Sequence, residues 1–388
     1  MAYNFYVKHL NRNGVVKSAA IVDFLSLAFK VDDEDAGWLT VSFNGSHRVV
    51  QNLEPYDLFE AHWKNDQLGL TSWQLGIEAF YDGALSDGTD DNLTRVVTLY
   101  LPGQLAILGL RQIAWASGYN NRSTFSMIPA ETIAKTIVTY NCTAFATTGN
   151  GRLRNGDLAT GMGWTIAVEA DGGGGNLDSK SFSNGNLLRV ITDDLSPVAG
   201  GAFSLTRTPA GGIEARWLFA WHAGQRGQDK RTGANAVEFS LARANMRNPR
   251  LSRNPVRTVA VAGGTGTGIN RLYRIVTGAT YAANNDAEMN VNALGQETPD
   301  RVISSANVAL QDEIDSGLRL EFDAIQTQAV FYSSIPVSGR KTYTVGDLVV
   351  ATYQNETYDR RIKSVTFSAI AAGGSSPDTQ LSVETVAV

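Results

Sequence analysis

The clearest hydrophobic pattern in the chain lies near its C-terminal end. In residues 343–353, β-branched, aliphatic and aromatic side chains surround a short turn at Gly346 and Asp347. Such side chains fit a pleated, half-buried surface, and Gly-Asp is typical of a turn. We therefore predict a strand that begins at Leu348. We also expect the Asp347 side chain to fix the turn by accepting a hydrogen bond.

Two further strands follow this one. In residues 360–367, Val365 and Phe367 alternate with polar positions while Ile362 is out of phase, which predicts one extra residue in the strand, a β-bulge. Alternation in residues 380–386 predicts a closing strand.

A similar order of elements occurs near the N-terminus. Asp57 precedes an apolar run as Asp347 does, and two more strands and a polar loop follow. We interpret this similarity as a hypothesis of two quasi-equivalent β units in one chain. The predicted N-terminal strands span residues 58–63, 75–81 and 94–101, with a polar loop at 82–92.

The middle of the chain adds two short helices to the expected strands. Pro129 and Glu131 indicate a helix start, because proline fits the first turn and an acid there complements the helix dipole. Asn186 is a suitable cap for a second helix that ends before Pro197. Residues 105–117 fit a buried strand or helix equally well. Other expected strands are 19–25, 37–43, 48–50, 202–206, 214–221, 237–241, 256–262 and 318–324.

A glycine-rich segment at residues 263–268 follows a strand, as a nucleotide-binding loop would. It lacks the Lys-Ser/Thr of a P-loop and the glycine spacing of a dinucleotide site, and residues 270–276 alternate like a strand. We therefore expect a hairpin and no bound cofactor. Residues 277–302 are polar and predict a long loop, whereas residues 305–317 have the cap, apolar stripe and final glycine of a third helix.

These patterns predict a mainly β protein with a few short helices. We expect two small β units and an α/β middle region. The predicted boundaries are 1–105 for the first β unit, 106–200 for a mixed α/β insertion and 261–317 for an inserted hairpin, loop and helix, with further strands in 201–260 and 318–388.

Composition excludes several classes of site. The 388 residues include 43% hydrophobic and 18% charged residues, a globular composition, and no apolar run approaches the ~20 residues of a membrane-spanning helix. Cys142 is the single cysteine, so neither an internal disulfide nor a multi-thiolate metal site is expected. The four histidines lack the spacing of a zinc-binding helix. We expect no catalytic residues, and, without a signal-peptide pattern, synthesis in a cytoplasm.

Charge is distributed unevenly along the chain. Residues 1–100 hold 14 acidic and 7 basic residues, a balance of −7, whereas residues 207–274 hold 12 basic and 3 acidic residues, a balance of +9. Pro249 and Pro255 exclude a helix through the arginine-rich part, which leaves an extended or turn-rich segment. Its arginines suit either phosphate contacts, as with nucleic acid, or a seam between subunits. The candidates are Arg243, Arg247, Arg250, Arg253 and Arg257.

A carbohydrate-binding or carbohydrate-active protein is the alternative from another class. Trp217 and Trp221 are four residues apart, which in a strand places both rings on one face. The competing interpretation is that both rings are core or interface anchors.

The order of elements resembles the tail hub, or baseplate hub, proteins of long-tailed bacteriophages. The motifs that carry the resemblance are Tyr343-Thr-Val-Gly-Asp-Leu-Val-Val, Tyr358-Asp-Arg-Arg-Ile-Lys-Ser-Val, the strand-glycine-strand segment 259–271, the helix from Ser305, and Pro55-Tyr-Asp-Leu. The resemblance implies a structural protein of the virion, without enzymatic activity, at the distal end of the tail. The resemblance also implies that both β units are β-barrel-like domains, and that insertions split the second one, so that residues 201–260 with 318–388 form it. It implies a homotrimer whose paired β domains match sixfold rings on one side and a threefold tip on the other. The implied partners are the distal tail or tail tube hexamer, the tape measure protein, tail tip or fibre proteins and, transiently, the exiting DNA.

Overall fold

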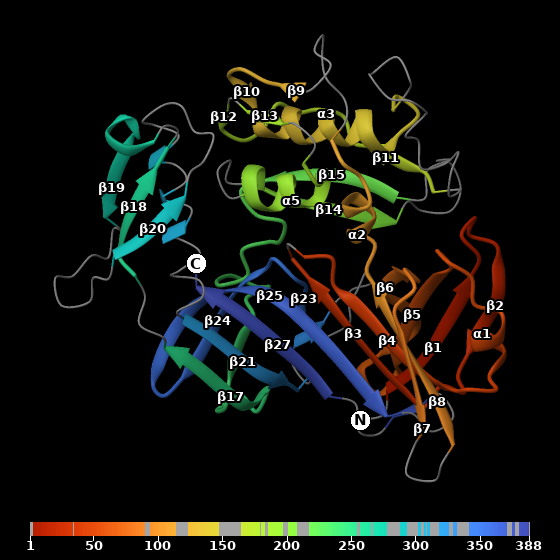
Figure 1. Cartoon of the computed structure of the whole chain (residues 1–388). Coiled ribbons are helices and arrows are strands. Elements are labelled where there is room, and N and C mark those ends of the chain that lie inside the picture. Colours follow the sequence, from red (N-terminus) through yellow and green to blue (C-terminus); the bar gives the residue numbers. More distant parts are fainter. Residues whose placement is uncertain are drawn as a thin grey trace.

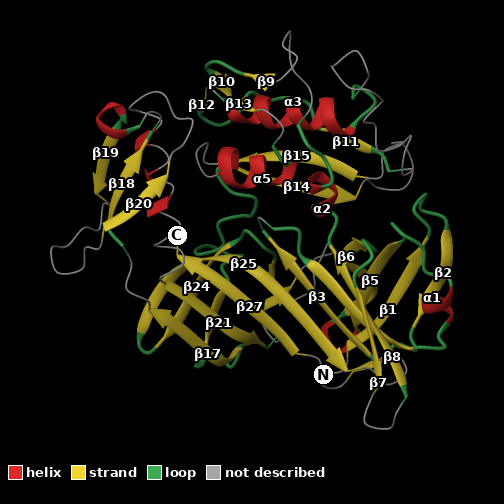
Figure 2. Cartoon of the chain, in the orientation of Figure 1, coloured by secondary structure: helices red, strands yellow, loops and turns green. Residues whose placement is uncertain are grey.

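The computed structural model shows a mainly β chain with a few short helices, as predicted (Figures 1 and 2). The strands form two large sheets, with a helical unit above them and a small sheet to one side (Figure 1). The structure describes residues 3–33, 35–89, 94–113, 123–146, 164–178, 180–182, 185–196, 201–207, 217–253, 257–264, 267–277, 288–292, 302–303, 306–307, 309–310, 318–325, 329–331, 341–370, 375–376 and 380–387.

The N-terminal sheet has five strands. Its order is β2 (Val16–Ile21), β1 (Tyr3–Leu10), β5 (Leu58–Asn65) and β6 (Leu70–Phe80), with β26 (Ser375–Ser376) paired to β1. The short helices α1 (Arg48–Gln51) and η1 (Asp66–Leu68) lie in its connections. The predicted strand at 48–50 is therefore wrong. The His47 side chain accepts a hydrogen bond from Val49 N and starts a helical turn instead.

A ten-stranded sheet joins the two ends of the chain. Its main path is β17 (Met246–Arg253), β21 (Leu318–Ala324), β27 (Gln380–Ala387), β25 (Glu356–Ile370), β3 (Ser26–Asp32), β4 (Trp38–Asn44), β8 (Arg95–Pro102) and β7 (Leu85–Thr89). β24 (Leu348–Tyr353) pairs with β25 and with β16 (Glu238–Ser240), and β22 (Ala329–Phe331) pairs with β23 (Lys341–Tyr343). The register of β25 shifts between Ile362 and Ser364, which confirms the predicted bulge. β7 occupies part of the predicted polar loop at 82–92, because it extends an existing sheet edge.

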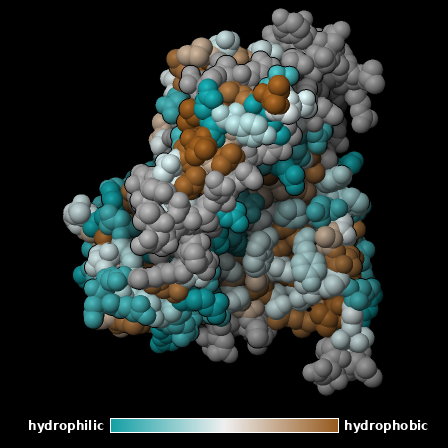
Figure 3. Space-filling model, turned by 60° about the vertical axis from the view of Figure 1, so that its left-hand side comes forward, coloured by the Kyte–Doolittle hydropathy of each residue, from teal (hydrophilic) through white to brown (hydrophobic). Residues whose placement is uncertain are grey.

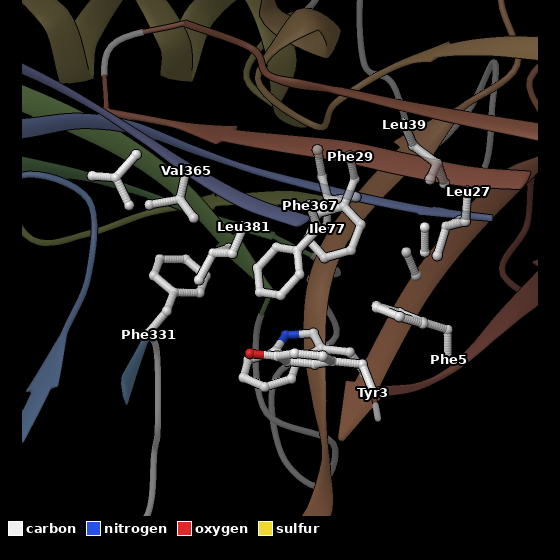
Figure 4. Packing of buried hydrophobic residues seen from close by; sticks show 14 of the residues in the cluster. Tyr3, Phe5, Leu27, Phe29, Leu39, Ile77, Phe331, Val365, Phe367 and Leu381 are labelled. Atoms are coloured by element: carbon white, nitrogen blue, oxygen red, sulfur yellow. The ribbon is translucent and has the colours of Figure 1, made fainter. Parts of the chain in front are cut away.

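The two β units share one hydrophobic core. β3 and β25 are paired antiparallel, so the N-terminal and C-terminal strands meet inside a single sheet. Figure 4 shows Phe5, Phe29, Phe331 and Phe367 packed into the same cluster from both ends of the chain. Burial of one continuous cluster couples the stability of the two units.

The helical unit covers the middle of the chain. Its helices are α2 (Ala106–Gly109), α3 (Ala130–Cys142), α5 (Leu187–Arg189) and the π-helix η3 (Val190–Leu195), so the helices predicted after Pro129 and Asn186 are confirmed. Asn186 accepts a hydrogen bond from Arg189 N at 3.2 Å, as a cap does. Its strands are β9 (Ser123–Thr124), β10 (Ile128–Pro129), β11 (Ile166–Val168), β12 (Leu177–Asp178), β13 (Ser181–Phe182), β14 (Gly201–Arg207) and β15 (Trp217–Ala223).

β14 and β15 belong to this middle unit. They form a three-stranded sheet with β11 and enclose a second core with α3. We expected residues 201–260 in the C-terminal barrel, but of the strands in this range only β16 and β17 lie in the ten-stranded sheet. Alternation alone predicts a strand but not its partner, which explains the difference.

The small inserted unit forms the third core. Its sheet has the order β19 (Tyr273–Thr277), β18 (Val259–Gly263) and β20 (Glu288–Asn292), with the turn η4 (Gly268–Asn270) between β18 and β19. The hairpin prediction is confirmed, whereas β20 lies in the predicted long loop at 277–302. Residues 306–307 and 309–310 are helical, and the rest of the predicted helix at 305–317 lies outside the described residues. Ala306 and Leu310 are buried against this sheet.

Candidate assembly surfaces

The Asp57 turn opens β5 through a buried carboxylate. Asp57 Oδ2 accepts a hydrogen bond from Glu54 N at 3.0 Å and pairs with Lys17 Nζ at 2.9 Å. His9 Nε2 lies 2.7 Å from the same oxygen. Burial alone would raise the pKa of Asp57, but the bonds from His9 and Lys17 hold it below its ordinary value. The charge is therefore stabilised in place, and the carboxylate closes the turn.

The Asp347 turn opens β24 in the same manner. Asp347 Oδ2 accepts a hydrogen bond from Thr344 N at 2.9 Å and pairs with Lys230 Nζ at 2.8 Å. Its second oxygen accepts from Gln228 N at 2.7 Å. Gly346 has φ of 85°, a left-handed conformation that favours glycine, and an added Cβ would meet Asp33 Oδ1 at 2.8 Å. Both conditions require glycine at position 346, and the bonds of the carboxylate account for aspartate at position 347.

The backbone around the two aspartates is also equivalent. In each turn the preceding residue has positive φ, 68° at Tyr56 and 85° at Gly346. Each turn is then tied to the next strand by two hydrogen bonds in the same arrangement. At the first turn, Tyr56 N donates to Tyr81 O (2.8 Å) and Tyr81 N donates to Asp57 O (2.8 Å). At the second turn, Gly346 N donates to Ile362 O (2.8 Å) and Ile362 N donates to Asp347 O (3.0 Å).

The order of strands after each turn extends this similarity. In the C-terminal unit the order is β24, β25, β27, β21 and β17. In the N-terminal unit β5 and β6 are followed by β8, β4 and β3, with β6 joined to β8 by a bridge between Ala79 and Gly103. The corresponding pairs are β24 with β5, β25 with β6, β27 with β8, β21 with β4 and β17 with β3. Along the chain, both sets of strands occur in the same order. The units differ where β1 runs antiparallel to β5, whereas β16 runs parallel to β24.

The candidate arginines follow one outer edge of the ten-stranded sheet. As predicted, the segment is extended, because it forms the outer strand β17 with a bulge between Arg247 and Arg250. Arg243 lies in the turn before β17, Arg253 is its last residue, and Arg257 is exposed beyond it.

Acidic residues lie opposite several of these arginines. Arg243 pairs with Glu238 at 2.5 Å, and Arg250 lies 3.9 Å from Glu321. Arg247 is exposed opposite Asp323 in the strand register. These contacts offset part of the positive charge, so the edge is less basic than its sequence suggests.

Two buried glutamates connect the N-terminal sheet to the middle unit. Glu60 of β5 and Glu78 of β6 are opposite each other in register, and so are Arg207 of β14 and Trp217 of β15. Glu60 pairs with Arg207 at 2.9 Å, and Glu78 accepts a hydrogen bond from Trp217 Nε1 at 2.7 Å. The four side chains therefore link two paired strands of one sheet to two paired strands of another.

Glu60 is held as a carboxylate in this link. Burial would raise its pKa, but the hydrogen bond with His62 and the charges of Arg207 and Lys8 lower the pKa to about 2. Nothing in the sequence pattern around Glu60 indicated this role. The signal that could have pointed to it is a charged residue at an inward position of a strand.

The tryptophans of the carbohydrate alternative are not on a surface. Trp217 and Trp221 are 1% and 6% exposed and belong to the core of the middle unit. Both rings are therefore core anchors and not a sugar-binding surface, because a sugar stacks on an aromatic face that is open to solvent. Within the described residues no three His, Cys, Asp or Glu side chains are grouped as a metal site requires, and no helix has the length and hydrophobicity to span a membrane.

The whole fold is similar to those of solved phage tail proteins. The 43 kDa tail protein of prophage MuSo2 from Shewanella oneidensis aligns with a TM-score of 0.57 and 13% identity over 99% of this chain and 98% of the other. A tail protein from Neisseria meningitidis aligns with a TM-score of 0.59 and 9% identity over 99% and 96%. A chain of the Francisella PdpA-VgrG complex aligns with a TM-score of 0.50 and 8% identity over 100% of this chain and 58% of its own.

The chain therefore has the fold of phage tail proteins, in agreement with the resemblance in its sequence. At these identities the similarity establishes the fold and leaves the function to be argued from the surfaces. No protein-family model matches the sequence, and no curated protein matches it either.

Proposed function

We propose that this chain is the structural hub of a phage tail. In this proposal three copies form a ring at the distal end of the tail tube and surround the DNA exit channel. Six similar β units would then face the sixfold rings of the tube, while the threefold axis serves the tip. The observation that carries the proposal is the duplicated turn at Asp57 and Asp347, in two units that are joined by one ten-stranded sheet.

The two outer strands of the ten-stranded sheet support ring closure. β17 and β7 end the main path of this sheet on opposite sides, so each copy offers one edge to each neighbour. Contacts between two different edges generate a closed ring when the rotation that relates one copy to the next returns to the first copy after a full turn. The charge at both edges is partly neutralised within the chain, because Asp87 of β7 pairs with Arg95 at 2.6 Å and Arg243 beside β17 pairs with Glu238 at 2.5 Å. Such edges can meet without strong repulsion.

The face of this sheet away from the core suits the wall of a channel. A row of hydroxyl side chains crosses four strands from Ser86 through Thr98 and Ser42 to Ser26. The hydroxyls of Ser26, Ser42 and Thr98 bond to one another at 2.9 and 2.8 Å. Hydroxyl groups carry no net charge, and these three already bond to one another. A wall of this kind would let a polyanion such as DNA pass without binding it.

Electron microscopy of the purified protein tests this proposal. We expect class averages of a ring with threefold symmetry and an open or closed central channel. Uniform particles of a single chain, or rings of another symmetry, would contradict it.

A further inference from the structure

The main path of the ten-stranded sheet contains the same block of four strands twice. The first block is β17-β21-β27-β25 and the second block is β3-β4-β8-β7. The first three strands of each block correspond between the two β units. The second half of β25 takes the place of β7, since it pairs with β27 as β7 pairs with β8. The sheet is therefore built from two successive blocks of one kind.

The two blocks are joined inside the chain by β25 and β3. These strands pair antiparallel, with Thr366 opposite Lys30 and Ser368 opposite Ala28. The ends of the sheet repeat the same two kinds of strand, because β7 ends the second block as β25 ends the first, and β17 begins the first block as β3 begins the second. A last strand and a first strand thus already meet once in every chain, and one strand of each kind lies at an end of the main path.

The two equivalent turns align the blocks residue by residue. The residues that close the turns, Ile362 and Tyr81, are equivalent. Two residues before them lie equivalent pairs of opposite residues, Arg360 with Ala387 and Ala79 with Gly103. This match aligns β27 with β8, and the ladders then align the strands on either side. The equivalent residues near the junction are Ser86 and Thr366, Gly88 and Ser368, Arg250 and Ala28, and Ser252 and Lys30.

The backbone groups of β7 match those of β25. In an antiparallel strand, alternate residues direct their N–H and C=O groups to the same neighbouring strand. Ala84 O accepts a hydrogen bond from β8, so Leu85 directs its groups to the open side of β7. Lys363 O accepts a hydrogen bond from Asp33 N, so Val365 directs its groups to β3. Leu85 and Val365 are equivalent, so β7 offers to the outside what β25 offers to β3.

The backbone groups of β17 are arranged to receive such a strand. Ile325 N donates to Asn245 O, and alternation along β21 then directs Arg250 toward β21. Leu251 and Arg253 therefore direct their backbone groups to the open side of β17. The bulge before Arg250 interrupts the ladder, which limits regular pairing to the last residues of the strand.

We propose that β7 of each copy pairs antiparallel with β17 of the next copy, in the register of the internal junction. The residue alignment places Ser86 opposite Ser252 of the next copy, and Gly88 opposite Arg250 of the next copy. This inference rests on the proposed ring and gives the contact that closes it. Because the last strand of one chain meets the first strand of another, the contact is heterologous and repeats around the ring.

Side chains on the core side of the sheet favour this contact. Leu85 is 42% exposed and Leu251 is half-buried against the main core, whereas their equivalents at the internal junction, Val365 and Phe29, are fully buried. Pairing of the two edges would bring Leu85 and Leu251 together and continue the core across the seam. Asp87, between them, is already paired within its own chain. Figure 3 brings the β17 side forward, and much of the lower part of this view is hydrophilic, so backbone pairing carries most of the contact.

Disulfide cross-linking tests the register. Ser86 and Ser252 direct their backbone groups into their own sheets, so they would form a non-hydrogen-bonded pair with Cα atoms about 4.5 Å apart, which a disulfide can span. The variant Ser86→Cys with Ser252→Cys is oxidised and separated under denaturing, non-reducing conditions. Cys142, the single native cysteine, is buried and does not interfere.

The matched control is a pair shifted by two residues, Ser86→Cys with Arg250→Cys, whose Cα atoms would be about 7–8 Å apart. The single variants are controls for self-pairing. Gly88→Cys with Arg250→Cys is a second aligned pair, and a Cβ added at Gly88 meets no atom within 4 Å. Light scattering under reducing conditions reports whether each variant is trimeric before oxidation.

We expect covalent dimers and trimers from both aligned pairs, and monomers from the shifted pair and from every single variant. Cross-linking of the shifted pair in place of the aligned pairs would overturn the register. Covalent dimers from a single variant would overturn the inference in favour of self-pairing. Trimeric variants that form no cross-link would overturn the seam and leave the ring intact, whereas a wild-type protein that is monomeric at every concentration would contradict the ring itself.

Discussion

Phe29 of β3 and Phe367 of β25 are opposite each other in register, and their rings stack with centroids 4.8 Å apart. The pair lies where the N-terminal and C-terminal β units join (Figure 4). Both rings are buried in the shared core. The two units are thus connected by a sheet and by its packing, and we expect them to unfold as one.

Phe367→Ala should lower the free energy of unfolding by about 3–5 kcal/mol, because it leaves a cavity at the seam of both units. Denaturant unfolding followed by fluorescence measures the change. Phe145→Ala is the control, since Phe145 is 62% exposed and its removal should change stability by less than about 0.5 kcal/mol. Two separate transitions in the Phe367→Ala protein, with one unit unaffected, would contradict a shared core.

Asp57→Ala and Asp347→Ala should have similar effects, because the two carboxylates close equivalent turns. Each change leaves a lysine and a backbone N–H without their acceptor, at a cost of about 3 kcal/mol in the free energy of unfolding. Asp66→Ala is the control, since the Asp66 side chain is 52% exposed and its ion pair with Lys64 is on the surface. If either turn variant had the stability of the wild type, that aspartate would have no structural role in its turn.

Glu60 gives the protein a defined acid sensitivity. Its pKa falls from 4.5 to about 2 on folding, so its contribution is complete above pH 4.5 and is lost as the pH falls toward 2. Ionised Glu60 adds about 3 kcal/mol to the free energy of unfolding, of which about 2 kcal/mol is lost at about pH 3. Glu60→Gln should therefore be less stable than the wild type near neutral pH and should lose less stability on acidification. Parallel pH profiles of the two proteins would contradict the link through Glu60.

Leu85→Pro tests the open edge of β7. Tyr100 N donates to Ala84 O, so in this antiparallel pair the N–H of the next residue, Leu85, points away from β8. Proline there removes a donor from the free edge and leaves the internal ladder intact. We expect Leu85→Pro to weaken the trimer by at least about tenfold, measured by light scattering against dilution. Leu85→Ala keeps the N–H and should remain closer to the wild type, so equal effects would show that the edge does not pair.

Much of the local structure could be predicted from the sequence, because it depends on neighbouring residues. Helix α3, its start at Pro129, the cap at Asn186 and the bulge after Ile362 all follow from local pattern. The Asp347 turn was also recognisable, and its likeness to the Asp57 turn was the basis of the repeat hypothesis.

The pairing of distant strands could not be predicted in this way. The alternation in β14 fits the C-terminal sheet as well as the middle one, and the register of β3 with β25 depends on both units at once. The link between Glu60 and Arg207 depends on two strands that only the tertiary structure brings together. Likewise β7 and β20 are short, polar strands that form because a neighbouring strand offers an edge.

The mass of the purified protein in solution is the most direct test of the central claim. Light scattering at several concentrations and salt levels should give three times the 41.8 kDa of one chain. Dissociation by salt would place the acidic and basic segments at the seam between copies. A mass of one chain at every concentration and salt level would contradict the ring.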